Sequence, residues 1–147
     1  MITYIKTEIP MLSYPVGAYI TANKPRIIKM AEAFCDIEEF KDKEINLICR
    51  GSSGAIIATI FSIILPNVTN IIHIKKEGES AHDNGLYMNG EKVNVIVDDI
   101  IATGATLNAI YNKVSNRLEN KPIDCVCITG CYDRSIKFEP KYVICSR

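Results

Sequence analysis

The sequence has no excess of charge of either sign, because Lys plus Arg and Asp plus Glu both total 17. This balance excludes the broad basic surface that non-specific binding of nucleic acid requires. A membrane-spanning run is also lacking, since the longest apolar run, residues 55–65, is far shorter than the roughly 20 residues that a helix needs to cross a bilayer. Lys6 and Glu8 interrupt the apolar residues of segment 1–12, which therefore lacks the continuous apolar core of a signal peptide. We expect a single cytoplasmic domain, residues 1–147, with neither nucleic acid nor a membrane as partner.

The sequence lacks the cysteine spacing of a zinc site, although it contains six cysteines. The densest group is CVCITGC at residues 125–131, but zinc sites use paired C-x-x-C spacing, and Cys125 and Cys127 fall on one face of a predicted strand. The chain is also long enough to form a core without disulfide bonds. We interpret the cysteines as reduced thiols that are mostly packed in the core.

The order of strand-like and helix-like patterns predicts an α/β domain. Residues 25–41 follow a cap signal, Asn23 and Pro25, and one helical face carries Ile27, Ile28, Ala31, Phe34 and Cys35. Further patterns predict strands at 45–49, 69–75, 93–99 and 123–129, helices at 55–65 and 104–118, and a tight loop, RGSSG, between the first strand and its helix. We expect a parallel twisted sheet with helices on both faces and a ligand site at the carboxyl ends of the strands.

Two other segments complete this organisation. Residues 77–90 are polar and contain Asn89-Gly90, a favourable hairpin turn, so we expect a mobile loop on a hairpin stem. His73 lies inside the apolar run at 69–75 and is interpreted as structural. Repeats, low-complexity segments and linkers are not evident in the sequence.

The stretch VIVDDIIATGATL, residues 95–107, holds the strongest functional signal. Asp98 and Asp99 end an apolar strand, and a turn of small and hydroxyl residues, 102–106, leads into a helix. Unpaired N–H groups at the start of a helix attract a phosphate. The turn lacks the Gly-Lys-Ser/Thr ending of a P-loop, and the two carboxylates would repel a phosphate unless another group lay between them. A ribose, with free hydroxyls toward the carboxylates and a 5′-phosphate toward the turn, resolves this conflict.

This stretch resembles the phosphoribosyl-pyrophosphate-binding motif of type I phosphoribosyltransferases. CRGSSG, residues 49–54, resembles the pyrophosphate loop of that family, with Arg50-Gly51 where the family often has a strained, sometimes cis, peptide. IHIKKEGESAH, residues 72–82, resembles the strand and flexible catalytic loop of the orotate branch. The resemblance covers roughly residues 25–145 and implies the same α/β fold, with residues 1–24 as a small N-terminal hood.

The resemblance implies a role for each matching residue. Catalytic roles would fall to Asp98 and Asp99, which would bind the ribose hydroxyls, and to Lys76, which would counter the charge of the leaving group. The substrate-binding set would be Arg50, Gly51 and Ser52 for the pyrophosphate, Lys75 beside Lys76, His82 in the mobile loop, and Ala102, Thr103, Gly104, Ala105 and Thr106 for the 5′-phosphate. Mg²⁺ would be held chiefly by substrate oxygens and water, with no protein ligand required.

The reaction implied is transfer of the 5-phosphoribosyl group from phosphoribosyl pyrophosphate to a nucleobase nitrogen, in nucleotide salvage or synthesis, by a homodimer. The acceptor base is left open, because Ala102 replaces the Asp of the hypoxanthine-guanine branch and Glu79 falls near the place of the further lysine of the orotate branch. FEPKYVI, residues 138–144, resembles the segment that supplies an aromatic stacking residue in 6-oxopurine enzymes, which would be Tyr142.

Two alternatives belong to other functional classes. A regulator of the same fold would bind phosphoribosyl pyrophosphate or a nucleotide without turnover. The enzyme is favoured because the pyrophosphate loop, the basic pair and the mobile loop are all present, and because no helix-turn-helix or basic extension is evident. An unrelated Rossmann-like nucleotide binder ranks last, because the G-x-G-x-x-G turn is missing.

Overall fold

The computed structural model contains a single six-stranded sheet and three α-helices among the residues that it describes. These described residues are 2–8, 24–75, 92–98, 105–115, 124–128 and 140–146. The elements in chain order are β1 (Thr3–Thr7), α1 (Lys24–Cys35), the 3-10 turn η1 (Glu38–Phe40), β2 (Ile45–Arg50), α2 (Gly51–Ile64), β3 (Val68–Ile74), β4 (Val93–Asp98), α3 (Ala105–Ser115), β5 (Asp124–Ile128) and β6 (Tyr142–Ser146).

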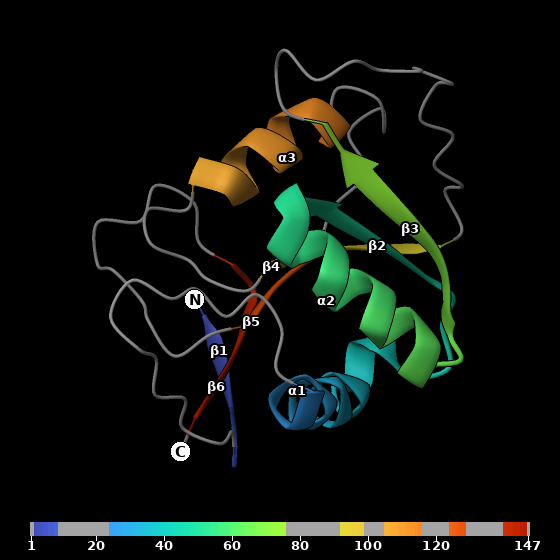
Figure 1. Ribbon diagram of the computed structural model, residues 1–147, viewed down its shortest axis with the longest axis vertical. Coiled ribbons are helices and arrows are strands. Elements are labelled where there is room, and N and C mark those ends of the chain that lie inside the picture. Colours follow the sequence, from blue (N-terminus) through green and yellow to red (C-terminus); the bar gives the residue numbers. More distant parts are fainter. Residues whose placement is uncertain are drawn as a thin grey trace.

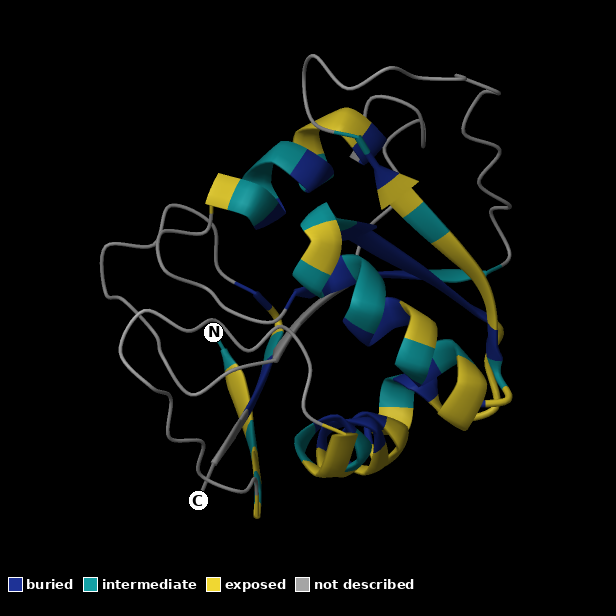
Figure 2. Ribbon diagram, in the orientation of Figure 1, coloured by how far each residue is buried: buried dark blue, intermediate teal, exposed yellow. Residues whose placement is uncertain are grey.

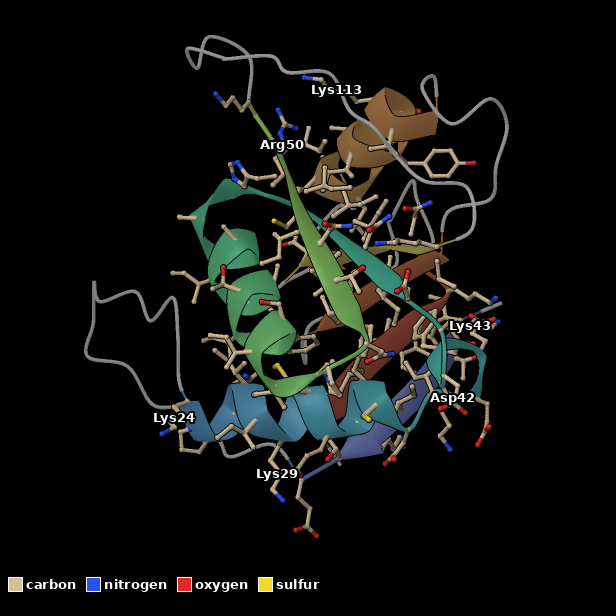
Figure 3. The ribbon with its side chains drawn as sticks, turned by 90° about the vertical axis from the view of Figure 1, so that its right-hand side faces the viewer. Lys24, Lys29, Asp42, Lys43, Arg50 and Lys113 are labelled. Carbon is tan, nitrogen blue, oxygen red and sulfur yellow. The ribbon has the colours of Figure 1, made fainter. Side chains whose placement is uncertain are left out.

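All six strands run parallel, in the order β1-β6-β5-β4-β2-β3 (Figure 1). Helices cover both faces: α1 and α2 pack against one, and α3 packs against the other. Seen from the edge formed by β3, α2 and α3 lie on opposite sides of the sheet (Figure 3). The predicted fold class is therefore confirmed. Within the described residues, no helix is both long enough and apolar enough to span a membrane.

Two apolar clusters correspond to these two layers. The larger joins α1 and α2 to the sheet through residues such as Phe34, Phe61, Leu47 and Val95. The smaller joins α3 to the opposite face and includes Ile48, Ile74, Ile96, Leu107 and Ile110. Successive residues of β2 and β4 point to opposite faces, so a strand that is buried on both faces must be apolar at nearly every position.

The helix predicted at 25–41 is shorter than expected. It ends at Cys35, and Asp36 and Ile37 then donate to the carbonyls of Ala33 and Phe34 in a tighter turn. This turn allows Phe40 to stack on Phe34 with ring centroids 5.1 Å apart. The predicted apolar face is also wrong at two places, because Cys35 is exposed and Ile28 only half-buried, while Met30 and Ala33 join Ile27, Ala31 and Phe34 in the core.

The predicted RGSSG loop is absent, because β2 continues to Arg50 and α2 begins at Gly51. A single residue makes the change of direction: Gly51 has φ 78°, in the left-handed region that glycine enters without a β-carbon penalty. Every peptide bond in the described part of the chain is trans.

The two outermost strands of the sheet, β3 and β1, also differ from expectation. The β-branched sequence of the strand predicted at 69–75 is typical of a buried strand, but β3 is an edge strand, with Thr69, Asn70, Ile71 and His73 exposed. At the other edge, residues 3–7 form β1 and pair with β6, so this part of the expected N-terminal hood belongs to the main sheet. Residues 9–23, the rest of the expected hood, and the loop expected at 77–90 lie outside the described residues.

Candidate functional site

Three neighbouring strands, β3, β2 and β4, bring Lys75, Arg50 and Asp98 to the side of the sheet where the carboxyl ends of the strands lie. Ile48 of β2 is in register with Ile96 of β4, and Arg50 and Asp98 each follow two residues later. On the other side, Arg50 is in register with Ile74 of β3, which Lys75 follows directly. Because parallel strands end at a common edge, the predicted pyrophosphate, leaving-group and ribose residues are next to one another.

Helix α2 begins directly at this edge and presses its first turn against β4. A β-carbon built on Gly54 would lie 3.4 Å from Cβ of Cys49, 3.8 Å from the carbonyl oxygen of Val97 and 3.9 Å from Oδ1 of Asp98. The first N–H groups of a helix have no partner inside the helix and carry the positive end of its dipole. The N–H groups at the start of α2, Gly51 and Ser52, therefore place positive partial charge beside the carboxylate of Asp98.

Asp98 is buried, with only 7% of its surface exposed. Its charge acts on a neighbouring thiol: burial and, to a smaller extent, the carboxylate of Asp98 together raise the pKa of Cys49 to about 11. Cys49 is thus a protonated core thiol at neutral pH, not a nucleophile.

The guanidinium of Arg50 contains a donor without a partner. Its Nε is buried and has no hydrogen-bond acceptor among the described residues. Native proteins pair nearly all buried polar groups, so an exception calls for a ligand or another explanation. Figure 3 shows Arg50 near the end of β3, far from Asp42 and Lys43, which precede β2 at the opposite edge.

Helix α3, like α2, begins on the side of the sheet where the strands have their carboxyl ends. Ala105 is exposed and Thr106 half-buried in its first turn, while Leu107, Ile110 and Val114 fix the helix on the sheet. β4 ends at Asp98 and α3 starts at Ala105, so the expected phosphate turn connects the two. The other predicted site residues lie outside the described part of the chain: Lys76, His82, Asp99, Ala102, Thr103 and Gly104.

Tyr142 does not fit the role of a base-stacking residue. Its ring packs edge-on against Phe40, with centroids 5.6 Å apart. Phe40 lies at the amino-terminal edge of the sheet, because its carbonyl accepts a hydrogen bond from Asn67, the residue before β3. Tyr142 is therefore directed toward the edge opposite Arg50 and Asp98, and this prediction is wrong.

The residues around Tyr142 form a structural cluster. Lys141 pairs with Glu39 at 2.6 Å and lies over the ring of Tyr142, 5.7 Å from its centroid. Burial raises the pKa of Glu39, but hydrogen bonds from Lys141 and Tyr142 and the charge of Lys141 outweigh this effect and lower it. The cluster fastens the turn before β2 to the start of β6.

Gly54 is a further residue of the junction between α2 and β4. The sequence predicts it as part of the RGSSG loop, whereas the structure buries it between Cys49 and Asp98. A signal was present, because Gly51 and Gly54 are three residues apart and would share one face of a helical turn.

The described residues contain no group of three or more His, Cys, Asp or Glu side chains that could hold a metal ion. Asp98 offers one buried carboxylate, a hard oxygen ligand of the kind that Mg²⁺ accepts. This donor set fits a Mg²⁺ ion that takes most of its ligands from a phosphate-rich substrate and water.

The fold is similar to that of several solved phosphoribosyltransferases. Over 83% of this chain and 81% of the other, it superimposes on the xanthine-guanine-hypoxanthine phosphoribosyltransferase of Helicobacter pylori with TM-score 0.64 and 14% identity. A purine phosphoribosyltransferase from Pyrococcus horikoshii gives TM-score 0.59 and 24% identity over 82% and 79% of the two chains. A hypoxanthine phosphoribosyltransferase from Staphylococcus aureus gives 0.59 and 16% over 82% and 70%.

Comparisons with models of protein families and with curated protein sequences find no match. The likeness to solved structures therefore establishes the fold of the chain.

Proposed function

We propose that the protein is a phosphoribosyltransferase, which moves the 5-phosphoribosyl group from phosphoribosyl pyrophosphate to a nucleobase nitrogen and releases pyrophosphate. The observation that carries this proposal is the buried carboxylate of Asp98 beside the first turn of α2, next to Arg50. A phosphate alone would be repelled by Asp98. A phosphorylated ribose places neutral hydroxyls against the carboxylate and anionic groups against the helix starts.

The described residues divide this ligand between them. Arg50, Gly51 and Ser52 hold the pyrophosphate through the free donors of the guanidinium and of the α2 start. Asp98 accepts hydrogen bonds from the ribose hydroxyls. Lys75 adds positive charge at the end of β3.

The remaining roles belong to the proposal through the sequence resemblance. Asp99 binds the ribose with Asp98, and Lys76 and His82 act from the loop that follows β3. Ala102, Thr103 and Gly104 complete the 5′-phosphate turn that leads to Ala105 and Thr106.

The chemistry needs positioning and electrostatics rather than a covalent nucleophile. As the bond between the anomeric carbon and pyrophosphate breaks, positive charge develops on the ribose and negative charge on the leaving group. Asp98 stabilises the first, and Arg50 with Lys75 stabilises the second. When bound, Mg²⁺ supplies further positive charge to the pyrophosphate oxygens. A cytoplasmic location and a homodimeric assembly are part of the same proposal.

The test is release of pyrophosphate from phosphoribosyl pyrophosphate and Mg²⁺ with a panel of bases. The panel begins with hypoxanthine, guanine, xanthine and adenine, because the three similar structures are purine enzymes by their names, and continues with uracil and orotate. Release that requires both one of these bases and Mg²⁺ supports the proposal. Absence of release with every base contradicts it.

Two matched variants refine this test. Asp98→Asn keeps the shape of the side chain but removes its charge, so turnover should fall roughly a hundredfold or more. Glu32→Gln makes the same chemical change at an exposed position of α1 and should leave turnover unchanged. Thermal stabilisation by phosphoribosyl pyrophosphate without turnover would instead support the non-catalytic regulator of the same fold.

A further inference from the structure

Strand β3 contains one residue more than its neighbour β2 near the amino-terminal end of the pair. Ile45 of β2 is in register with Val68. The next residue of β2, Asn46, is in register with Asn70, so Thr69 has no partner in β2. Such a β-bulge is rare between parallel strands, and bulges often lie where a strand re-aims its side chains near a functional site. The extra residue of β3 therefore needs an explanation.

The bulge changes the faces to which the residues of β3 point. Side chains of a regular strand alternate between the two faces, so Val68, Ile72 and Ile74 would share one face. Instead, Val68 belongs to the cluster under α1 and α2, whereas Ile72 and Ile74 pack in the cluster under α3. The extra residue makes both contacts possible. By the same alternation, Lys75, which follows Ile74, lies on the side of α2.

The apolar pattern of β3 fixes these faces only weakly. β3 is an edge strand, and exposed residues run along it in Figure 2. If Thr69 were paired like any other residue of the strand, every residue after it would move to the opposite face. Ile72 and Ile74 would then lie on the side of α2 and Ile71 on the side of α3, so each face would still receive isoleucine. In that register Lys75 would lie on the side of α3.

Polar contacts hold the bulged register. Nζ of Lys92, the residue before β4, donates to Oγ1 of Thr69 at 2.9 Å. The Lys92 side chain is only 18% exposed and reaches past β2, which lies between β4 and β3. At the next position, Nδ2 of Asn70 donates to Oδ1 of Asn46 at 2.8 Å. A slip would turn Asn70 away from Asn46, which is 2% exposed, and a buried polar group that loses its partner is costly.

We propose that the bulge at Thr69 is a positioning device, because it selects the register of β3 that puts Lys75 on the side of α2. Lys92 and Asn70 hold this register. Helix α2 begins directly after the last residue of β2, level with the end of β3. Lys75 thus lies on the same side as the helix start that we assign to pyrophosphate, and the inference rests on that part of the proposed function. Thr69 and Lys92 lie at the amino-terminal side of the sheet and act through β3.

The test is the affinity of the full chain for inorganic pyrophosphate with Mg²⁺, measured by calorimetry. Lys92→Met keeps the aliphatic stem and removes the ammonium group, and Thr69→Val removes the hydroxyl that accepts from it. Each should weaken binding roughly tenfold, the change expected when one charged contact with the ligand is lost. In a chain that already carries Lys75→Met, neither variant should weaken binding further, because the bulge acts through Lys75.

Deletion of Thr69 provides a rescue. Without the extra residue, Val68 and Asn70 pair with consecutive residues of β2, and every later side chain keeps the face that it has in the wild type. The chain then needs no contact to hold a bulge. Deletion of Thr69 in Lys92→Met should therefore restore the affinity for pyrophosphate to within about twofold of wild type. A lysine that only stabilised the fold would not be rescued in this way.

The matched control is Glu44→Gln. Lys92 also pairs with Glu44 at 3.6 Å, and this variant removes the ion pair but leaves the hydrogen bond to Thr69. It should bind pyrophosphate as wild type does. Circular dichroism checks that every variant is folded, and if Lys92→Met does not fold, Thr69→Val with and without Lys75→Met decides.

Four results overturn the inference: a wild-type chain that does not bind pyrophosphate, wild-type affinity in both Lys92→Met and Thr69→Val, losses that add to that of Lys75→Met, and a folded deletion variant that is not rescued. The proposed function fails on a different result. A chain that binds pyrophosphate with the expected pattern, but releases none from phosphoribosyl pyrophosphate with any base, would retain the positioning device without being a transferase.

Discussion

Gly54 and Asp98 face each other where α2 meets the end of β4. A β-carbon on Gly54 would lie 3.9 Å from Oδ1 of Asp98 and 3.4 Å from Cβ of Cys49. The positive end of the helix thus lies close to the carboxylate, with room at Gly54 for no more than a methyl group in contact with it. In the proposed complex, this short approach sets the separation between the ribose site at Asp98 and the pyrophosphate site at the start of α2.

Substitution of Gly54 should affect activity before it affects stability. Gly54→Ala gains about 1 kcal/mol of helix propensity, and its β-carbon meets Cys49, Val97 and Asp98 at van der Waals distances, so the free energy of unfolding in urea should stay the same or rise. The added methyl group lies against Asp98 and should lower kcat/KM for phosphoribosyl pyrophosphate. Gly54→Val overpacks the junction and should cost about 1–3 kcal/mol. Ser62→Ala, in the last turn of the same helix, is the control; equal turnover in Gly54→Ala and wild type would contradict this role.

Arg50 should lower the stability of the ligand-free protein slightly and should contribute to ligand binding. Its buried Nε has no partner among the described residues, and an unpaired buried donor costs about 1–3 kcal/mol. Arg50→Met keeps the aliphatic length and removes the donor, so the melting temperature without ligand should stay the same or rise. The melting-temperature increase caused by phosphoribosyl pyrophosphate should disappear, whereas Arg50→Lys should retain part of it. A large loss of stability in ligand-free Arg50→Met would show that the guanidinium is structural.

The fold was predictable because the strands and helices of this chain have distinct apolar patterns. VNVIV and INLIC are short apolar runs rich in β-branched residues, a pattern typical of strands that are buried on both faces. The sequence could not show which strand lies at an edge, because the β-branched residues of β3, including Ile71 and Ile72, are typical of a buried strand. Edge position depends on strand order, which is a tertiary property.

The relative positions of the candidate site residues could be predicted where the backbone fixes them, but not where tertiary contacts fix them. Arg50 and Asp98 could be placed together because both end parallel strands. Tyr142 could not be assigned, because its contact with Phe40 joins residues that are distant in the sequence. The early end of α1 at Cys35 also depends on a tertiary contact, because the stacking of Phe40 on Phe34 overrides a helical pattern that continues to residue 41.

Asn46 and Asn94 should fix the register of β2 and β4. Nδ2 of Asn46 donates to Oδ1 of Asn94 at 2.9 Å, and both side chains are at least 96% buried. Asn46→Leu leaves Asn94 unpaired and also removes the Oδ1 that accepts from Nδ2 of Asn70 at 2.8 Å, so the free energy of unfolding should fall by about 1–3 kcal/mol. Asn46→Leu with Asn94→Leu removes both buried groups of the pair and should recover the part of this loss that comes from Asn94. Additive losses in the two single variants and the double variant would show that the pair is not coupled.

Cys49 should make the protein less stable at high pH. Burial, together with the charge of Asp98, raises the pKa of its thiol from 9.0 to about 11 in the folded state. Between these two pH values the folded state binds more protons than the unfolded state, so the contribution of the thiol to stability is complete below pH 9 and is lost as the pH rises toward 11. The loss is at most about 3 kcal/mol.

Urea unfolding at a series of pH values should therefore show a steeper decline in the free energy of unfolding above pH 9 for wild type than for Cys49→Ala, in which lysines and the other thiols still titrate. Cys35→Ala, which removes an exposed thiol, should follow the wild-type curve. Parallel curves for wild type and Cys49→Ala would mean that the thiol of Cys49 has the same pKa in the folded and unfolded states.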